Sequence, residues 1–78
     1  MPTLLRIQGF RFYFYANEGS EPPHVHVDKG DGTGKLWLVD VRWAYSAGFS
    51  RAQQGTITQI VQQHHAELRA KWNEFFGT

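Results

Sequence analysis

The alternation of apolar and polar side chains at the start of the chain predicts a β-hairpin. Strands over residues 3–8 and 10–15 meet at Gly9, which readily supplies the positive φ of a primed hairpin turn. The register that makes one face almost wholly apolar pairs Ile7 with Phe10, Leu5 with Phe12 and Thr3 with Phe14. The opposite face carries Leu4, Arg6, Arg11, Tyr13 and Tyr15. We expect the apolar face to line the core.

A second pair of strands is predicted after a polar loop at residues 17–23. Two prolines at the end of this loop disfavour helix and lead into an extended segment at residues 24–28. A glycine-rich turn at residues 29–34 then separates it from a further strand at residues 35–39. The sheet therefore has about four strands, arranged as two hairpins.

The C-terminal half of the chain is predicted to be helical. Asp40 is expected to cap a short helix that reaches about Ala47, and Gly48 suits the left-handed residue that ends it. Ser50 and Gln53 match a capping box, which predicts a long helix from there to about residue 76. Its apolar stripe at the helical period consists of Ile57, Ile60, Val61, His64, Leu68, Trp72 and Phe75. We expect the histidine in this stripe to be a satisfied core residue.

These elements predict an α+β fold. A small antiparallel sheet of about four strands is packed on one face by the long C-terminal helix, with the short helix preceding it. We expect residues 1–78 to form a single domain, because a chain of this length supports only one thin core.

Composition narrows the possible functions. Eight Lys and Arg against seven Asp and Glu give a net charge of +1, which argues against a strongly electrostatic nucleic-acid or membrane binder. The absence of cysteine excludes disulfides and a thiolate zinc site. No apolar run approaches the roughly 20 residues of a membrane span. We therefore expect a cytoplasmic protein with no membrane contact.

The strongest candidate for a functional site is the sequence His-Val-His-Val-Asp at residues 24–28. Side chains alternate along a strand, so His24, His26 and Asp28 share one side and the valines face the other. The side away from the core then carries Arg6, Arg11, Tyr13, Tyr15, His24, His26, Asp28, Lys35 and Trp37. We expect this face to be open, and three functions compete for it.

A divalent metal such as zinc is the first candidate, with His24, His26 and Asp28 as ligands, since imidazole and carboxylate form a familiar first shell. The second is metal-free acid–base chemistry on a phosphodiester. In that case His24 and His26 are the catalytic acid and base, and Arg11 and Lys35 contact phosphate. On this hypothesis His24→Ala and His26→Ala abolish activity and leave the fold intact.

The third candidate is a binding surface formed by Arg11, Tyr13, Tyr15, Lys35 and Trp37. Its partner is a small protein or, by stacking on the aromatic rings, RNA. A face covered by the chain's own loops, or by a second copy in a homodimer, is an equally plain explanation.

The residues that carry a family resemblance run through the whole chain. They are Met1-Pro2-Thr3, Arg6-Ile7-Gln8-Gly9-Phe10-Arg11-Phe12, Pro22-Pro23-His24-Val25-His26-Val27, Lys35-Leu36-Trp37-Leu38, Gly48-Phe49-Ser50 and Trp72-Asn73-Glu74-Phe75-Phe76. In order and spacing the chain resembles the bacterial domain-of-unknown-function family 4160, and the Pro-Pro-His-Val-His-Val string is the most specific part. Asn73 stands where relatives often carry histidine, which counts against a catalytic role there.

The resemblance implies a small stand-alone bacterial protein, often encoded beside another small gene in an arrangement similar to toxin–antitoxin pairs. We therefore expect a partner-binding component of a toxin–antitoxin-like module. The alternative is a histidine-dependent RNA-cleaving toxin, metal-assisted or not, so whether the protein is an enzyme stays open.

Overall fold

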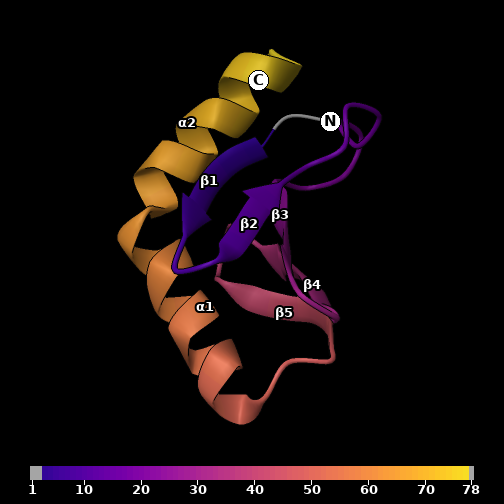
Figure 1. Ribbon diagram of the computed structural model, residues 1–78. Helices are drawn as coiled ribbons and strands as arrows, with labels where there is room; N and C mark the ends of the chain where they lie inside the picture. Colours follow the sequence, from indigo (N-terminus) through magenta and orange to yellow (C-terminus); the bar gives the residue numbers. More distant parts are fainter. Residues whose placement is uncertain (1–2, 78) are drawn as a thin grey trace.

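The computed structural model describes residues 3–77, and within them the chain forms five strands and two helices (Figure 1). The elements are β1 (Thr3–Ile7), β2 (Phe10–Tyr13), β3 (His24–Lys29), β4 (Gly32–Trp37), β5 (Arg42–Ala47), α1 (Arg51–Gln63) and α2 (His65–Phe76). Met1 and Pro2, which belong to the first string of the resemblance, and Thr78 lie outside the described residues. The α+β class with an antiparallel sheet is as predicted, and a fifth strand is added.

The sheet is antiparallel, and its spatial order follows the chain from β1 to β5. Figure 1 shows α1 and α2 following one another along one side of this sheet. Between them lies one apolar core, to which Phe12, Val25 and Leu36 contribute from the strands. Ile57, Val61 and Leu68 contribute from the helices. The valines of β3 therefore face the core, as the alternation predicted.

The first hairpin largely follows the predicted register. Ile7 pairs with Phe10 and Leu5 with Phe12, and both residues of the turn have positive φ. A bulge between Thr3 and Leu5 then shifts the pairing, so that Thr3 lies opposite Tyr13 and not opposite Phe14. A bulge adds an unpaired residue to one strand and changes which partner comes next, which no alternation pattern reveals.

The short helix predicted between Asp40 and Ala47 is wrong, because this segment forms the edge strand β5. Pairing with β4 satisfies the backbone hydrogen-bonding groups of this segment. An isolated helix of this length is only marginally stable in water, so the pairing favours the strand. Val41 turns the chain into the strand with a positive φ of 52°.

The glycine-rich turn predicted at residues 29–34 is shorter in the structure, because two of its glycines belong to a strand. Gly32 and Gly34 lie in β4, so the turn at residues 29–34 shrinks to a tight connection and the strand begins earlier than predicted. A Cβ on Gly32 would lie 2.3 Å from the Phe49 ring, and one on Gly34 would lie 2.6 Å from the Trp43 ring. Glycine is required at these two strand positions because aromatic rings occupy the space that a Cβ atom would take.

The predicted long helix starts where expected, at the Ser50–Gln53 capping box, but it is divided at His64. There φ is −105° and ψ is 17°, outside the helical range. His64 turns toward Glu67 and is not a core residue. Phe75, also predicted in the stripe, is 49% exposed, whereas Leu68 and Trp72 are buried as predicted. None of the described helices is long and apolar enough to cross a membrane.

Candidate functional site

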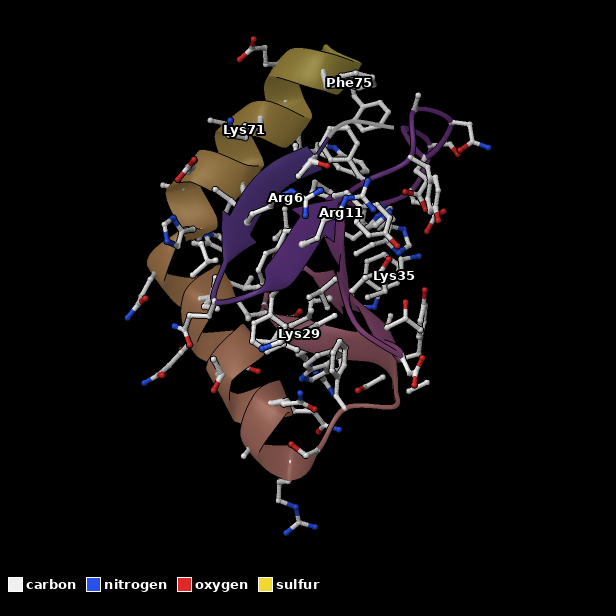
Figure 2. All side chains as sticks on the ribbon, in the orientation of Figure 1. Arg6, Arg11, Lys29, Lys35, Lys71 and Phe75 are labelled. Atoms are coloured by element: carbon white, nitrogen blue, oxygen red, sulfur yellow. The ribbon has the colours of Figure 1, made fainter. Side chains whose placement is uncertain are left out.

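Cross-strand pairing brings the predicted site residues into three rows on one side of the sheet. Tyr13, His26, Lys35 and Tyr45 form the middle row, Arg11, Asp28 and Thr33 the row below, and His24 with Trp37 the row above. We call these nine residues, with Tyr15, the outer face. Figure 2 shows Arg11 and Lys35 on the side of the sheet away from the helices. The pairing places the predicted residues of β2, β3 and β4 on one side of the sheet, and Arg6 of β1 pairs with Arg11. Thr33 and Tyr45 were not among the predicted residues.

The expectation that the whole outer face is open is wrong for the part around the histidines. His24 is 0% exposed, His26 5% and Tyr13 4%. Glu18, from the connection between β2 and β3, contacts both imidazole rings. A polar loop therefore covers this half of the face, which was one of the explanations left open.

Glu18, His24 and His26 form a compact cluster in which one ligand atom from each residue lies within 4.8 Å of the others. Nε2 of His26 donates to the Glu18 carboxylate, at 2.9 Å from Oε2 and 3.1 Å from Oε1. Nε2 of His24 lies 2.9 Å from Oε1, without the alignment of a hydrogen bond. One carboxylate thus serves two buried rings.

Neighbouring groups fix the orientation of His24. Its Nδ1 donates to the Pro22 carbonyl at 2.9 Å, so in the neutral ring Nε2 carries a lone pair. The ring packs against Trp72 and Trp37, with centroids 4.9 and 5.6 Å away. The two prolines before β3 hold the extended backbone that turns this carbonyl back onto the ring.

The Glu18 carboxyl is held in its ionised form. Burial alone would raise its pKa, but the Tyr15 backbone N–H at 2.8 Å and the rings of His26 and His24 outweigh burial. Together they lower the pKa of Glu18 from 4.5 to about 2. The cluster therefore contains a persistent negative charge beside two imidazoles.

Asp28, predicted as the third metal ligand, does not join the histidines. Its carboxylate accepts hydrogen bonds from the Tyr13 hydroxyl at 2.9 Å and from Thr33 at 2.7 Å. Burial, followed by these contacts with Asp28, raises the pKa of Tyr13. The nearby carboxylate is supplied by Glu18, which sequence reasoning missed because it lies in a loop with no periodic pattern.

The cations predicted to contact phosphate have partners within the chain. Nε of Arg11 donates to Thr3 at 2.9 Å, and its guanidinium lies 4.5 Å from the centre of the Tyr13 ring. Nζ of Lys35 contacts Glu21 at 2.7 Å and lies 4.5 Å from the centre of the Trp37 ring. With His24 fully buried, this arrangement argues against direct acid–base attack on a phosphodiester.

The remaining histidines lie outside the cluster. His64 contacts Glu67 within α2 at 3.1 Å, and its side chain is one-third exposed. His65 hydrogen-bonds to the Leu38 carbonyl and links α2 to the end of β4. A pocket of about 460 Å³ opens between β1 and α2, where Figure 2 labels Lys71 and Phe75. No histidine lines it, so it is separate from the cluster.

Comparison with known proteins identifies a family and no function. The family model described as Domain of unknown function (DUF4160) matches residues 9–73. No curated protein and no solved structure matches the chain. The matched range begins after β1 and includes β2 to β5, the outer-face residues, the histidine cluster and Trp72.

Proposed function

Because the chain belongs to the DUF4160 family, whose description assigns no activity, we propose its function from the geometry: it is a partner-binding protein. The proposed interface is the part of the outer face that the loop leaves uncovered. The proposed partner is a small protein encoded beside it, in a toxin–antitoxin-like pair of the bacterial cytoplasm. The main support for the proposal is the exposure of aromatic rings on this face.

All three tyrosines of the chain lie on the outer face, and two of them remain accessible. Tyr15 is 42% exposed and Tyr45 47%, while Trp37 between the loop and β5 is half-buried. Tyrosine and tryptophan bury a large area while losing few rotatable bonds, which makes them frequent anchors of interfaces. A partner that covers these rings removes apolar area from water at low entropic cost.

The accessible rings are held by a rigid surround. Tyr15 packs edge-on against Tyr13 and His26, with centroids 5.5 and 5.0 Å away. Trp37 is held between the His24 ring and the Lys35 ammonium. A surface that keeps its shape before binding loses less conformational entropy in the complex.

The proposal is tested with the small protein encoded next to this one. The two chains are co-expressed, and affinity is measured by calorimetry for wild type, Tyr45→Ala and Trp37→Ala. We expect each substitution to weaken binding by about 1–2 kcal/mol, which is roughly 5- to 30-fold in affinity. Gln62→Ala, at an exposed position of α1, is the control and leaves affinity unchanged.

Failure to form a complex would overturn the proposal, as would equal losses for Gln62→Ala and the face variants. RNA cleavage stays a separate prediction, and growth and RNA integrity on induction of the protein alone would detect it. Arrest with cleaved RNA in the absence of a partner would favour the toxin over the partner-binding protein. Size measurement of the isolated chain in solution separates a homodimer from a complex with the neighbour.

A further inference from the structure

We propose that Glu18, His24 and His26 bind one divalent transition-metal ion, with Zn²⁺ as the reference case. The three side chains come from two segments, the loop after β2 and the strand β3, and converge with their ligand atoms within 4.8 Å of one another. The three ligands lie beneath the loop and beside the proposed partner interface, where the rings of His24 and His26 contact Trp37 and Tyr15.

A buried nitrogen lone pair points to a cation. Because Nδ1 of His24 donates to the Pro22 carbonyl, Nε2 of the neutral ring has no proton to give. That atom is inaccessible to water, and among the described residues it has no hydrogen-bond partner. It lies 2.9 Å from a carboxylate oxygen, which is also an acceptor. Two facing acceptors repel each other unless a proton or a metal ion lies with them, and an ion satisfies both.

The surroundings of the ligands match those of metal sites. A histidine ligand typically donates its second ring N–H to a carbonyl or carboxylate, which fixes its tautomer, and His24 does so to Pro22. The carboxylate of a ligand is typically hydrogen-bonded as well, and the Tyr15 N–H bonds Glu18. The His26 ring stacks on Tyr13 at 5.3 Å and 19°. These contacts hold the three ligand side chains in their orientations before an ion binds.

The donor atoms select the class of metal. Two imidazole nitrogens and one carboxylate oxygen suit Zn²⁺, Co²⁺, Ni²⁺ and Fe²⁺, whereas Mg²⁺ and Ca²⁺ prefer oxygen donors throughout. Zinc bonds to nitrogen and oxygen measure about 2.0–2.2 Å, which places tetrahedral ligand atoms about 3.4 Å apart. The two imidazole–carboxylate contacts of 2.9 Å therefore lengthen by a few tenths of an ångström, and ligand atoms as far apart as 4.8 Å move closer. Three protein ligands leave one position for water.

Metal binding at this site would fasten the loop to the sheet. Glu18 is the loop residue that covers the histidines, and next to it Gly19 packs so closely on Phe76 that a Cβ would lie 2.6 Å from the ring. An ion shared by Glu18 and β3 therefore stabilises the loop and, through it, the contact with the end of α2. Binding to the folded state alone raises the melting temperature.

The test uses the full chain without a histidine tag, after treatment with a chelator. Zn²⁺, Co²⁺ and Mg²⁺ are titrated separately, and calorimetry and thermal melting are recorded for wild type, Glu18→Gln and His26→Gln. The matched control is His64→Gln/Glu67→Gln, which removes another histidine–carboxylate pair at 3.1 Å with no third ligand. We expect one Zn²⁺ per chain, a higher melting temperature, and no such effect of Mg²⁺. Each cluster variant should bind Zn²⁺ roughly 100-fold more weakly, since losing even a supporting group costs 10- to 100-fold.

A second measurement needs no variant. NMR of the wild type follows the ring signals of the four histidines during Zn²⁺ titration. We expect the signals of His24 and His26 to shift and those of His64 and His65 to stay. The proposal is overturned if no stoichiometric binding occurs, if the helix histidines shift instead, or if the cluster variants bind as tightly as the control. In the first case a proton shared among the three groups would explain the cluster.

Discussion

The imidazole of His24 is a structural side chain whatever else it does. It is fully buried, touches the rings of Trp37 and Trp72, and satisfies the Pro22 carbonyl. We predict that His24→Ala lowers the free energy of unfolding by about 2–4 kcal/mol, because it leaves a cavity in the core and removes the hydrogen bond to the Pro22 carbonyl. Urea denaturation measures the loss. This corrects the expectation that alanine at this position leaves the fold intact.

His64→Ala is the matched control for that prediction. The His64 side chain is one-third exposed and contacts only the surface carboxylate of Glu67 among the described interactions. Its loss should change stability by no more than about 0.5 kcal/mol. Equal effects of the two substitutions would contradict the structural role of His24.

Glu18 makes the stability of the metal-free protein depend on acid pH. Its pKa is about 2 in the folded state against 4.5 ordinarily, so its contribution is complete above about pH 4.5. The contribution is lost as the pH falls from there toward 2, because the unfolded chain takes up the proton first. At about 1.4 kcal/mol per pKa unit, the loss is at most about 3 kcal/mol.

Urea midpoints at several pH values, in the presence of a chelator, test this dependence. Glu18→Gln should be less stable than wild type at pH 7 and should show a shallower decline below pH 4.5. Glu67→Gln retains the Glu18 cluster and should decline as wild type does. A Glu18→Gln curve parallel to wild type would exclude the carboxylate as the source.

The site residues were predictable from the sequence only where a local pattern fixed them. Alternation along one strand placed His24, His26 and Asp28 on one side, and the structure agrees. Alternation says nothing about loops, so the contact of Glu18 with both histidines was missed, and Asp28, which was predicted to join them, is hydrogen-bonded to Tyr13 instead. The burial of His24 also depends on the loop and on distant Trp72, neither of which is visible in a window of sequence.

At the scale of elements, a helix start set by neighbouring residues was predicted correctly, whereas a strand set by pairing with another strand was not. The Ser50–Gln53 capping box is made within one turn and predicted the helix start. The segment that forms β5 has apolar spacing compatible with a short helix, and only pairing with β4 decides for strand. Gly34 resembled a turn residue because its partner, the Trp43 ring, comes from that same unpredicted strand.

Two glycines in different elements should respond oppositely to alanine. Gly55 lies in the middle of α1 with open space around it, so Gly55→Ala should stabilise the protein by about 0.5–1 kcal/mol. Gly48 has a φ of 77°, and a Cβ there would lie 2.8 Å from the Asp31 carbonyl oxygen. Gly48→Ala should destabilise it by about 2 kcal/mol or more, from the left-handed backbone and the contact.

Thermal melting of the two variants beside wild type decides this prediction. The expected result is a higher melting temperature for Gly55→Ala and a lower one for Gly48→Ala. A fall in both would mean that the middle of α1 requires glycine for a reason outside backbone entropy.

At the scale of the molecule, Trp72 joins the core layer to the outer face. It is 2% exposed and contacts the rings of Phe14, Phe76 and His24. Removing it should therefore disturb the helix, the sheet and the histidine cluster together. We predict that Trp72→Ala costs about 3–5 kcal/mol, a large share of the stability of a 78-residue chain.

Trp72→Phe tests the contact between position 72 and His24 in a chain that still folds. Phenylalanine keeps a ring among Phe14 and Phe76, so the chain should stay folded and lose about 1–2 kcal/mol. The smaller ring makes less contact with His24, so the affinity for Zn²⁺ should fall severalfold. The affinity for the protein partner, which depends on Tyr45, should stay unchanged. Circular dichroism establishes the fold, and calorimetry measures both affinities. A Trp72→Phe protein with wild-type stability and zinc affinity would show that α2 and the histidine cluster are independent of each other.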